Sequence, residues 1–137
     1  MTDHIQRLKD EHKDFNVSDL DSSFESNPIK AFQQWFDHAC NSNEDEPNAF
    51  CLSTVDVLTH QPSSRIVYLK DLRNNELVFY TNYSSKKGLE IEKNGNASML
   101  FFWPGLQRQI RIQGVLNKIS IRYQRVGYSP HPRFFEQ

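Results

Sequence analysis

The 137-residue sequence has few of the features that assign a chain to a common class. Its only cysteines, Cys40 and Cys51, lack a C-x-x-C spacing, which predicts free thiols in a reducing cytoplasm, with one structural disulfide as the alternative. No apolar run approaches the roughly 18 residues of a membrane span, and the charged N-terminus does not resemble a signal peptide. The net charge of −1 disfavours a dedicated nucleic-acid binder. We therefore expect a cytoplasmic protein that binds neither membranes nor nucleic acids.

The common catalytic and nucleotide-binding motifs are also missing. The sequence contains no G-x-G-x-x-G, P-loop or G-x-S-x-G motif. Its histidines show no metal-ligand spacing, and no serine or cysteine has a visible base partner. No catalytic side chain and no metal site are therefore predicted. An enzyme of this kind would leave the chemistry to a cofactor.

The residue pattern predicts a polar N-terminal segment at 1–26 and one domain at 27–137. The domain starts with a helix, because Asn27 suits the N-cap and Pro28 suits the first helical position. An apolar face then recurs at helical spacing, formed by Ile29, Phe32, Trp35, Phe36 and Ala39. The sequence has 10 phenylalanines, so we expect aromatic packing to supply much of the core.

The rest of the domain is predicted to be mainly β. Five strands are expected, at 49–57, 64–71, 76–82, 97–103 and 106–120. The Arg73-Asn74-Asn75 turn predicts an antiparallel hairpin, and a short helix is expected at 84–93. The alternation of apolar residues slips at Gly114, which predicts a bulge. This α+β pattern indicates a small antiparallel barrel, which leaves no exposed strand edge.

The start of the expected helix at 84–93 is the strongest candidate ligand site. Lys86 and Lys87 lie there although a helix N-terminus already carries a partial positive charge, so each should cost about 0.3–1 kcal/mol. A phosphate would offset this cost and would suit the free backbone N–H groups, which Gly88 allows it to approach closely. The alternative is a solvated, charged helix start.

Other polar residues could contact the same kind of ligand. Arg65 and Lys70 lie five positions apart on one expected strand, so they should face opposite sides and could bind two different anions. The third strand ends with Tyr80-Thr81-Asn82, where the Thr81 hydroxyl and backbone groups could hydrogen-bond a polar ring edge. One face of the fifth strand is polar and comprises Gln107, Gln109, Arg111 and Gln113. Ordinary surface residues are the alternative for each of these groups.

Together these motifs resemble the pyridoxamine 5′-phosphate (pyridoxine 5′-phosphate) oxidase family. The elements S-R-I-V-Y-L-K, F-Y-T-N, S-K-K-G and F-x-W-x-x-L-x-R-Q-x-R-I-x-G occur in the family's order and approximate spacing. The resemblance covers the leading helix and the chain from about residue 49 to 120. It implies an FMN-binding split β-barrel and an obligate homodimer that binds flavin where the two subunits meet.

The resemblance also implies particular site residues. The FMN contacts would be Arg65, Ile66, Val67, Tyr68, Leu69, Lys70, Tyr80, Thr81, Lys86, Lys87 and Gln109, with Arg65 near the phosphate. The B6-substrate contacts would be Lys70, Tyr128 and Arg133. The last two echo a family motif without its spacing, and a C-terminal R-L-H-D-R motif typical of the family is absent.

The implied function is FMN-dependent oxidation of pyridoxamine or pyridoxine 5′-phosphate to pyridoxal 5′-phosphate, with hydride transfer to the flavin and O2 as the final acceptor. Because the R-L-H-D-R motif is absent, one alternative is a non-catalytic FMN or B6-phosphate binding protein that retains the phosphate cradle. A structural dimer whose cations only solubilise it is a third hypothesis.

Overall fold

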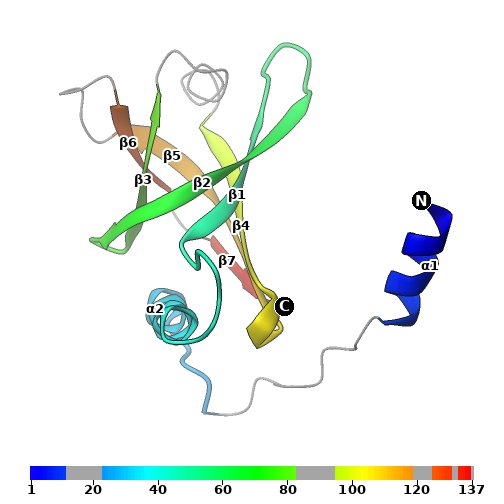
Figure 1. Cartoon of the computed structure of the whole chain (residues 1–137). Helices are drawn as coiled ribbons and strands as arrows, with labels where there is room; N and C mark the ends of the chain where they lie inside the picture. The colour runs from blue at the N-terminus through cyan, green and yellow to red at the C-terminus, as the bar shows by residue number, and fades with distance from the viewer. Residues whose placement is uncertain (12–22, 83–94, 119–124, 131–132, 137) are drawn as a thin grey trace.

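A computed structural model describes residues 1–11, 23–82, 95–118, 125–130 and 133–136. Seven strands curl into an antiparallel barrel, and one helix lies beneath its lower end (Figure 1). The strands are β1 (Ala49–Val55), β2 (Pro62–Arg73), β3 (Glu76–Asn82), β4 (Asn96–Trp103), β5 (Arg108–Lys118), β6 (Arg125–Pro130) and β7 (Arg133–Glu136). The helices are α1 (Thr2–Asp10), α2 (Pro28–Cys40) and the short 3-10 helix η1 (Pro104–Leu106).

The strand order explains how the barrel closes. The sheet runs β4-β1-β2-β3-β6-β5-β7, and β4 also pairs with β5. Strand β5 pairs with β4 along most of its length, whereas only its end, from Leu116 to Lys118, pairs with β6. Strand β7 pairs with the middle of β5, at Ile110–Gln113. The five predicted strands are confirmed in order, and β6 and β7 are two strands that the sequence reading did not predict.

Helix α2 forms where its capping and apolar signals predicted it. The Asn27 side chain accepts hydrogen bonds from the backbone N–H groups of Ile29 (3.0 Å) and Lys30 (3.2 Å), and Pro28 occupies the first turn. Phe32 and Ala39 are buried, so the apolar face of the helix packs on the lower end of the barrel. Within the described part of the chain, no helix is long and apolar enough to cross a membrane.

Aromatic rings fill the lower half of the core, as the phenylalanine content predicted. Phe101 is fully buried, and its ring centroid lies 5.1 Å from that of Phe50 and 5.2 Å from that of Phe32. Trp103 is 5.9 Å away and donates its indole N–H to the carbonyl oxygen of Pro47 (3.0 Å). Such ring pairs add about 0.5–1.5 kcal/mol each to the effect of burial. They attach α2 and the loop after it to β1 and β4.

The β2–β3 hairpin is confirmed, and it contains a β-bulge that the sequence did not predict. Asn74 and Asn75 both have positive φ (52° and 61°), as a type I′ turn requires. The register shifts between Leu69 and Asp71, which leaves Lys70 as the extra residue of a β-bulge.

The bulge predicted at Gly114 is wrong. The β4–β5 register is continuous from the Asn96–Val115 pair to the Trp103–Arg108 pair. Val115 is 42% exposed and Leu116 is 5% exposed, so the inward series of Ile110 and Ile112 continues to Leu116. Val115 is an apolar residue on the outer face, which the pattern misread as a slip in the alternation.

Some expectations fall outside the described residues. The helix expected at 84–93, with Lys86, Lys87 and Gly88, is among them, and the division of the chain at residue 26 remains a prediction. Cys40 and Cys51 are both free thiols, as expected from their spacing. The α1 helix lies apart from the barrel (Figure 1), and none of its residues is buried.

Candidate functional site

Strand β2 presents its two predicted cations on opposite faces. Arg65 lies on the inward side with Val67 and Leu69, which are 6% and 7% exposed. Lys70 lies on the exposed side with Ile66 and Tyr68. The predicted opposite orientation is therefore confirmed. Because Val67 and Leu69 point into the core, any contact they make with a ligand outside the barrel has to come from the backbone.

The Arg65 guanidinium is fixed by neutral oxygen atoms. Its Nη1 donates to the Thr54 hydroxyl (2.7 Å) and to the carbonyl oxygen of Leu52 (3.2 Å), and its Nη2 donates to the Ser63 hydroxyl (2.7 Å). Thr54 is fully buried, so this acceptor cannot move away. The structure therefore presents Arg65 as a preoriented, half-buried cation.

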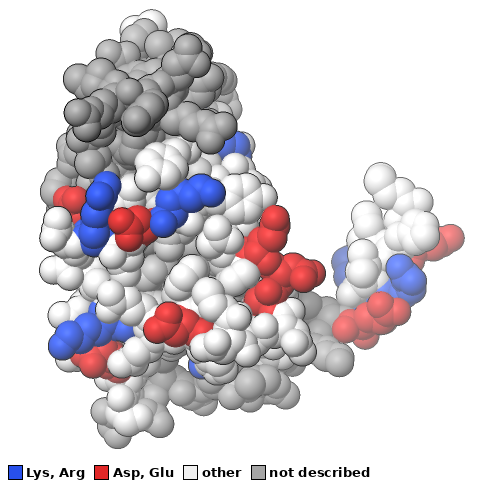
Figure 2. All heavy atoms as spheres, turned by 60° about the vertical axis from the view of Figure 1, so that its left-hand side comes forward, with Lys and Arg blue, Asp and Glu red and all other residues white. Residues whose placement is uncertain are grey.

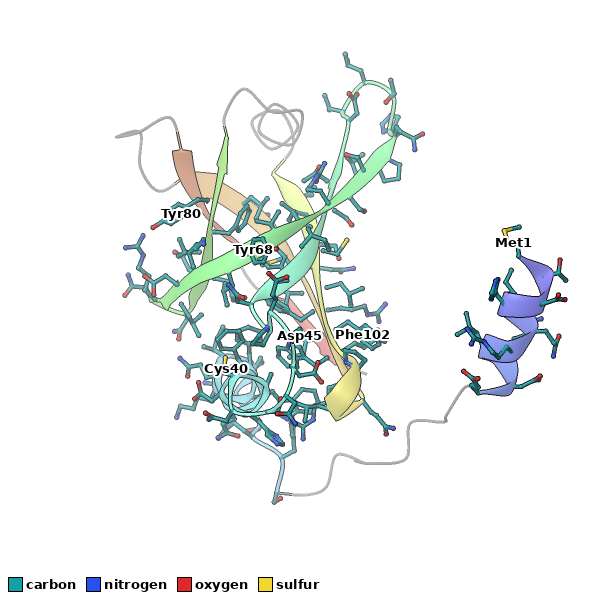
Figure 3. All side chains as sticks on the ribbon, in the orientation of Figure 1. Met1, Cys40, Asp45, Tyr68, Tyr80 and Phe102 are labelled. Carbon is teal, nitrogen blue, oxygen red and sulfur yellow. The ribbon has the colours of Figure 1, made fainter. Side chains whose placement is uncertain are left out.

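The bulge turns Lys70 towards a cleft between β2 and α2. Its Nζ lies 5.9 Å from the ring centroid of Tyr68, whose hydroxyl donates to the Glu46 carboxylate (3.3 Å). The cleft has a volume of about 580 Å³ and is lined on its helix side by Phe32, Phe36, Asp37 and Cys40. Figure 3 shows Cys40 on α2, below Tyr68 on β2. Partial burial, and then the Asp37 carboxylate, raise the pKa of the Cys40 thiol.

Strand β3 pairs with β2 as far as Phe79, and its last residues pair with β6. Tyr80 is 50% exposed (Figure 3), and Thr81 pairs with Val126 of β6. Tyr128 pairs with Phe79, so its backbone is close to that of Tyr80, whereas Arg133 lies on β7 opposite Gln113. The side chains of Thr81, Tyr128 and Arg133 lie outside the described part of the structure, as do Lys86 and Lys87.

Gln109 lies on a different part of the sheet. It pairs with Phe102 at the start of β5, on the outer face that the alternation of β5 predicted. Reading across the strands, Arg111 pairs with Leu100, Leu100 with Cys51, and Cys51 with Ile66. Three strand spacings of about 4.8 Å therefore place β5 roughly 14 Å from β2. One chain alone does not bring Gln109 to Arg65 or Lys70.

The outer face between β2 and β5 combines apolar and small polar side chains. Ile66 is 61% exposed and Phe102 is 51% exposed. A row of polar residues crosses four strands in register and comprises Ser64, Ser53, Ser98 and Gln113. The hydroxyls of Ser53 and Ser64 are 2.7 Å apart. Sequence reasoning missed this row, although the alternation within each strand places all four residues outward.

On the face drawn in Figure 2, neither charge predominates. Basic and acidic residues are interspersed there over the described part. This agrees with the net charge of −1. Within the described ranges, no three His, Cys, Asp or Glu side chains come together as they would around a metal ion.

Comparison with known proteins places this geometry in a family. A family model described as pyridoxamine 5′-phosphate oxidase matches residues 36–126, which is more than half of the chain. The chain belongs to the pyridoxamine 5′-phosphate oxidase family. It is 44% identical over 115 residues to the pyridoxine/pyridoxamine 5′-phosphate oxidase of Bordetella pertussis, an alignment that covers 77% of this chain and 54% of that protein. The chain spans about half the length of the curated family members that it matches.

Solved structures share the fold of this chain. PhzG from Burkholderia lata, in complex with tetrahydrophenazine-1-carboxylic acid, superposes with a TM-score of 0.76 at 20% identity, covering 85% of this chain and 83% of that one. A pyridoxamine 5′-phosphate oxidase-related, FMN binding protein from Nostoc punctiforme superposes with a TM-score of 0.62 at 22% identity, covering 74% and 53%. The predicted split β-barrel is confirmed.

Proposed function

We propose that this chain binds FMN and oxidises pyridoxamine or pyridoxine 5′-phosphate to pyridoxal 5′-phosphate. Membership of the pyridoxamine 5′-phosphate oxidase family supports the proposal, as do the name of the Bordetella relative and the description of the Nostoc protein as FMN binding. The carrying observation is that β2 holds two cations on opposite faces. FMN and the substrate each carry one phosphate, so two separate cations suit them.

The described residues fit the flavin in their chemistry. Arg65 is oriented before any ligand arrives, which lowers the entropy lost on binding a phosphate. The backbone of β2 and the exposed Tyr80 would flank the ring, with Lys86 and Lys87 completing the phosphate site. Lys70 would hold the substrate phosphate from the other face of the strand, together with Tyr128 and Arg133.

The position of Gln109 supports a site shared by two copies of the chain. Three strand spacings separate Gln109 from β2, so Gln109 is not beside Arg65 or Lys70 within one chain. The outer face that bears it also exposes Ile66 and Phe102, and apolar side chains grouped in this way favour cover by a second surface. We therefore propose a homodimer in which Gln109 of one copy completes the flavin site of the other.

The chain's own part in the reaction is binding and orientation. Bound FMN would supply the redox chemistry: the substrate loses two electrons and two protons overall, one of them with the electrons as hydride from carbon and the other from its amine or alcohol group, and O2 takes them up as hydrogen peroxide. For the amine substrate, one water enters and one ammonia leaves. Lys70 would fix the substrate by its phosphate, so that the reacting carbon is held at one position.

A binding and turnover experiment tests the proposal. When FMN is mixed with the purified protein, its fluorescence should be quenched, and the titration should give a Kd in the micromolar range or lower. Aerobic incubation of this complex with either B6 phosphate should then produce hydrogen peroxide. Binding without peroxide would support the non-catalytic alternative, and an absence of binding would contradict both.

Two variants and a control separate the two cations. Arg65→Met should weaken FMN about ten- to hundredfold, because a hydrogen bond to a charged group is worth about 1.5–3 kcal/mol. Lys70→Met should mainly raise the KM for the B6 phosphate. Lys30→Met removes an exposed cation on α2 and should change neither quantity.

A further inference from the structure

The turn between β4 and β5 is held from outside by a carboxylate. Glu44 lies in the loop between α2 and β1, 62 positions before Leu106 in the sequence, and its Oε1 accepts the backbone N–H of Leu106 (2.9 Å). Leu106 ends η1, and β5 starts two residues later at Arg108. The hydrogen bond therefore fixes the point from which β5 sets out.

The turn is shaped to admit this carboxylate. A Cβ added to Gly105 would lie 2.5 Å from Glu44 Oε1, so a larger residue would push the carboxylate away. Gln107 follows in the left-handed region, with φ 54° and ψ 44°. Such a conformation costs a non-glycine residue roughly 1–2 kcal/mol and persists only when its surroundings enforce it.

The loop that carries Glu44 is itself attached to α2. The Ser42 hydroxyl donates to the carbonyl oxygen of Ala39 (2.7 Å) and accepts the backbone N–H of Glu44 (3.3 Å). On the far side of the turn, Arg108 stacks its guanidinium 4.4 Å from the Trp35 ring centroid. The start of β5 is thus fixed to α2 from two sides.

We propose that Glu44 is a positioning residue for the flavin site. By fixing η1, it sets where β5 begins and therefore how Gln109 stands beside Phe102 on the outer face. The inference rests on the proposed contact between Gln109 and the flavin of a second copy. Glu44 itself lies beside the turn and acts through the backbone of Leu106.

Four variants of the full chain test this role. Glu44→Ala removes the acceptor, whereas Glu44→Gln keeps an amide oxygen that can accept the same N–H. Gln109→Ala removes the proposed contact itself. Asp45→Ala is the matched control, because Asp45 is exposed and lines the same hollow of about 520 Å³ as Glu44 and Phe102. Asp45 and Phe102 are labelled in Figure 3.

The measurements are FMN affinity from fluorescence quenching and the side-chain amide NMR signals of Gln109 in the flavin-free protein. Glu44→Ala and Gln109→Ala should each weaken FMN binding about fivefold to tenfold. The double variant should bind FMN no more weakly than Gln109→Ala alone. Glu44→Gln and Asp45→Ala should stay within about twofold of the wild type. The Gln109 signals should shift in Glu44→Ala and not in Asp45→Ala.

The outcomes distinguish the possible failures. If Gln109→Ala weakens FMN binding and Glu44→Ala does not, the positioning role is refuted and the flavin site stands. The same conclusion follows if the effects of the two substitutions on FMN affinity multiply in the double variant. If the wild type binds FMN and Gln109→Ala binds it equally well, the contact and the positioning role both fail. If the wild type binds no FMN, the proposed function itself fails and the positioning role with it. Should Glu44→Ala not fold, Gly105→Ala displaces the same carboxylate from the other partner and should weaken FMN equally.

Discussion

Replacing Thr54 with valine should loosen Arg65 while leaving the core filled. Thr54 is fully buried, and its hydroxyl accepts a 2.7 Å hydrogen bond from Arg65 Nη1. Valine has nearly the same size and shape but has no acceptor. The substitution therefore removes one of the oxygen atoms that orient the guanidinium and creates almost no cavity.

The structure sets the size of the effect. Hydrogen bonds to charged groups contribute about 1.5–3 kcal/mol, and the cost here should be at the lower end because Arg65 is only half-buried and keeps Leu52 and Ser63 as acceptors. We expect a loss of about 1–1.5 kcal/mol in the free energy of unfolding, which corresponds to roughly 3–6 °C in Tm. FMN affinity should fall about fivefold, because the freed arginine loses rotamer entropy when it binds the phosphate.

Thermal unfolding by circular dichroism and FMN titration measure the two effects. Thr54→Ser is the control, because it keeps the hydroxyl and loses one buried methyl group, at a cost of about 1 kcal/mol in stability. The serine variant should therefore unfold earlier and bind FMN like the wild type. Equal FMN affinity in the valine and serine variants would show that Thr54 contributes packing alone and would refute the preorientation of Arg65.

Three further predictions follow from other parts of the fold. Phe101→Ala should destabilise the chain by about 3–5 kcal/mol in denaturant unfolding, because Phe101 is fully buried among other aromatic rings; a loss under 1 kcal/mol would contradict the described core. In a Cys51→Ser background, alkylation of Cys40 by iodoacetamide should need a higher pH than an unhindered thiol because its pKa is raised, and Asp37→Asn should lower that pH; an unchanged profile would argue against the Asp37 contribution. His60→Gly should raise or preserve Tm, because His60 has φ 58°, a left-handed conformation that costs a non-glycine residue roughly 1–2 kcal/mol. Glycine avoids this cost but loses about 1 kcal/mol through the greater entropy of the unfolded chain. A marked fall in Tm would show that the imidazole stabilises the turn.

Local signals predicted the parts of the fold that depend on neighbouring residues. The Asn27-Pro28 start of α2 and the Asn74-Asn75 turn each need only a few consecutive residues, and both formed as predicted. The strand at 76–82 was predicted to the residue for the same reason, because a tight turn fixes where it begins.

Predictions that inferred which face a side chain lies on from whether the residue is apolar were less reliable. Val115 suggested a slip in β5 because it is apolar, yet it lies on an outer face where apolar residues are expected if a second copy covers them. The real bulge at Lys70 does change the alternation, since Leu69 and Leu72 both pack inward although they are three positions apart. The strand was predicted to end at residue 71, before this change, so the bulge was missed. Strands β6 and β7 were missed because their partners are distant in the sequence. Strand β6 pairs with β3 and β5, and β7 pairs with β5, so no short window of sequence contains these contacts.

The same distinction applies to the site. Motif spacing placed Arg65 and Lys70 on opposite faces of β2 correctly, because strand parity is a local property that the bulge leaves intact up to Lys70 itself. It could not show that Gln109 lies three strands away, which depends on the order in which the barrel closes. Glu44 was invisible for a stronger reason: its partner is a backbone N–H, which every residue but proline has, so no residue type marks the contact. Only Gly105, whose lack of a side chain leaves room for the Glu44 carboxylate, indicates this contact in the sequence. The proposed flavin site is therefore defined by residues that would bind the flavin and by residues that fix strand ends, and motif comparison identifies the first kind alone.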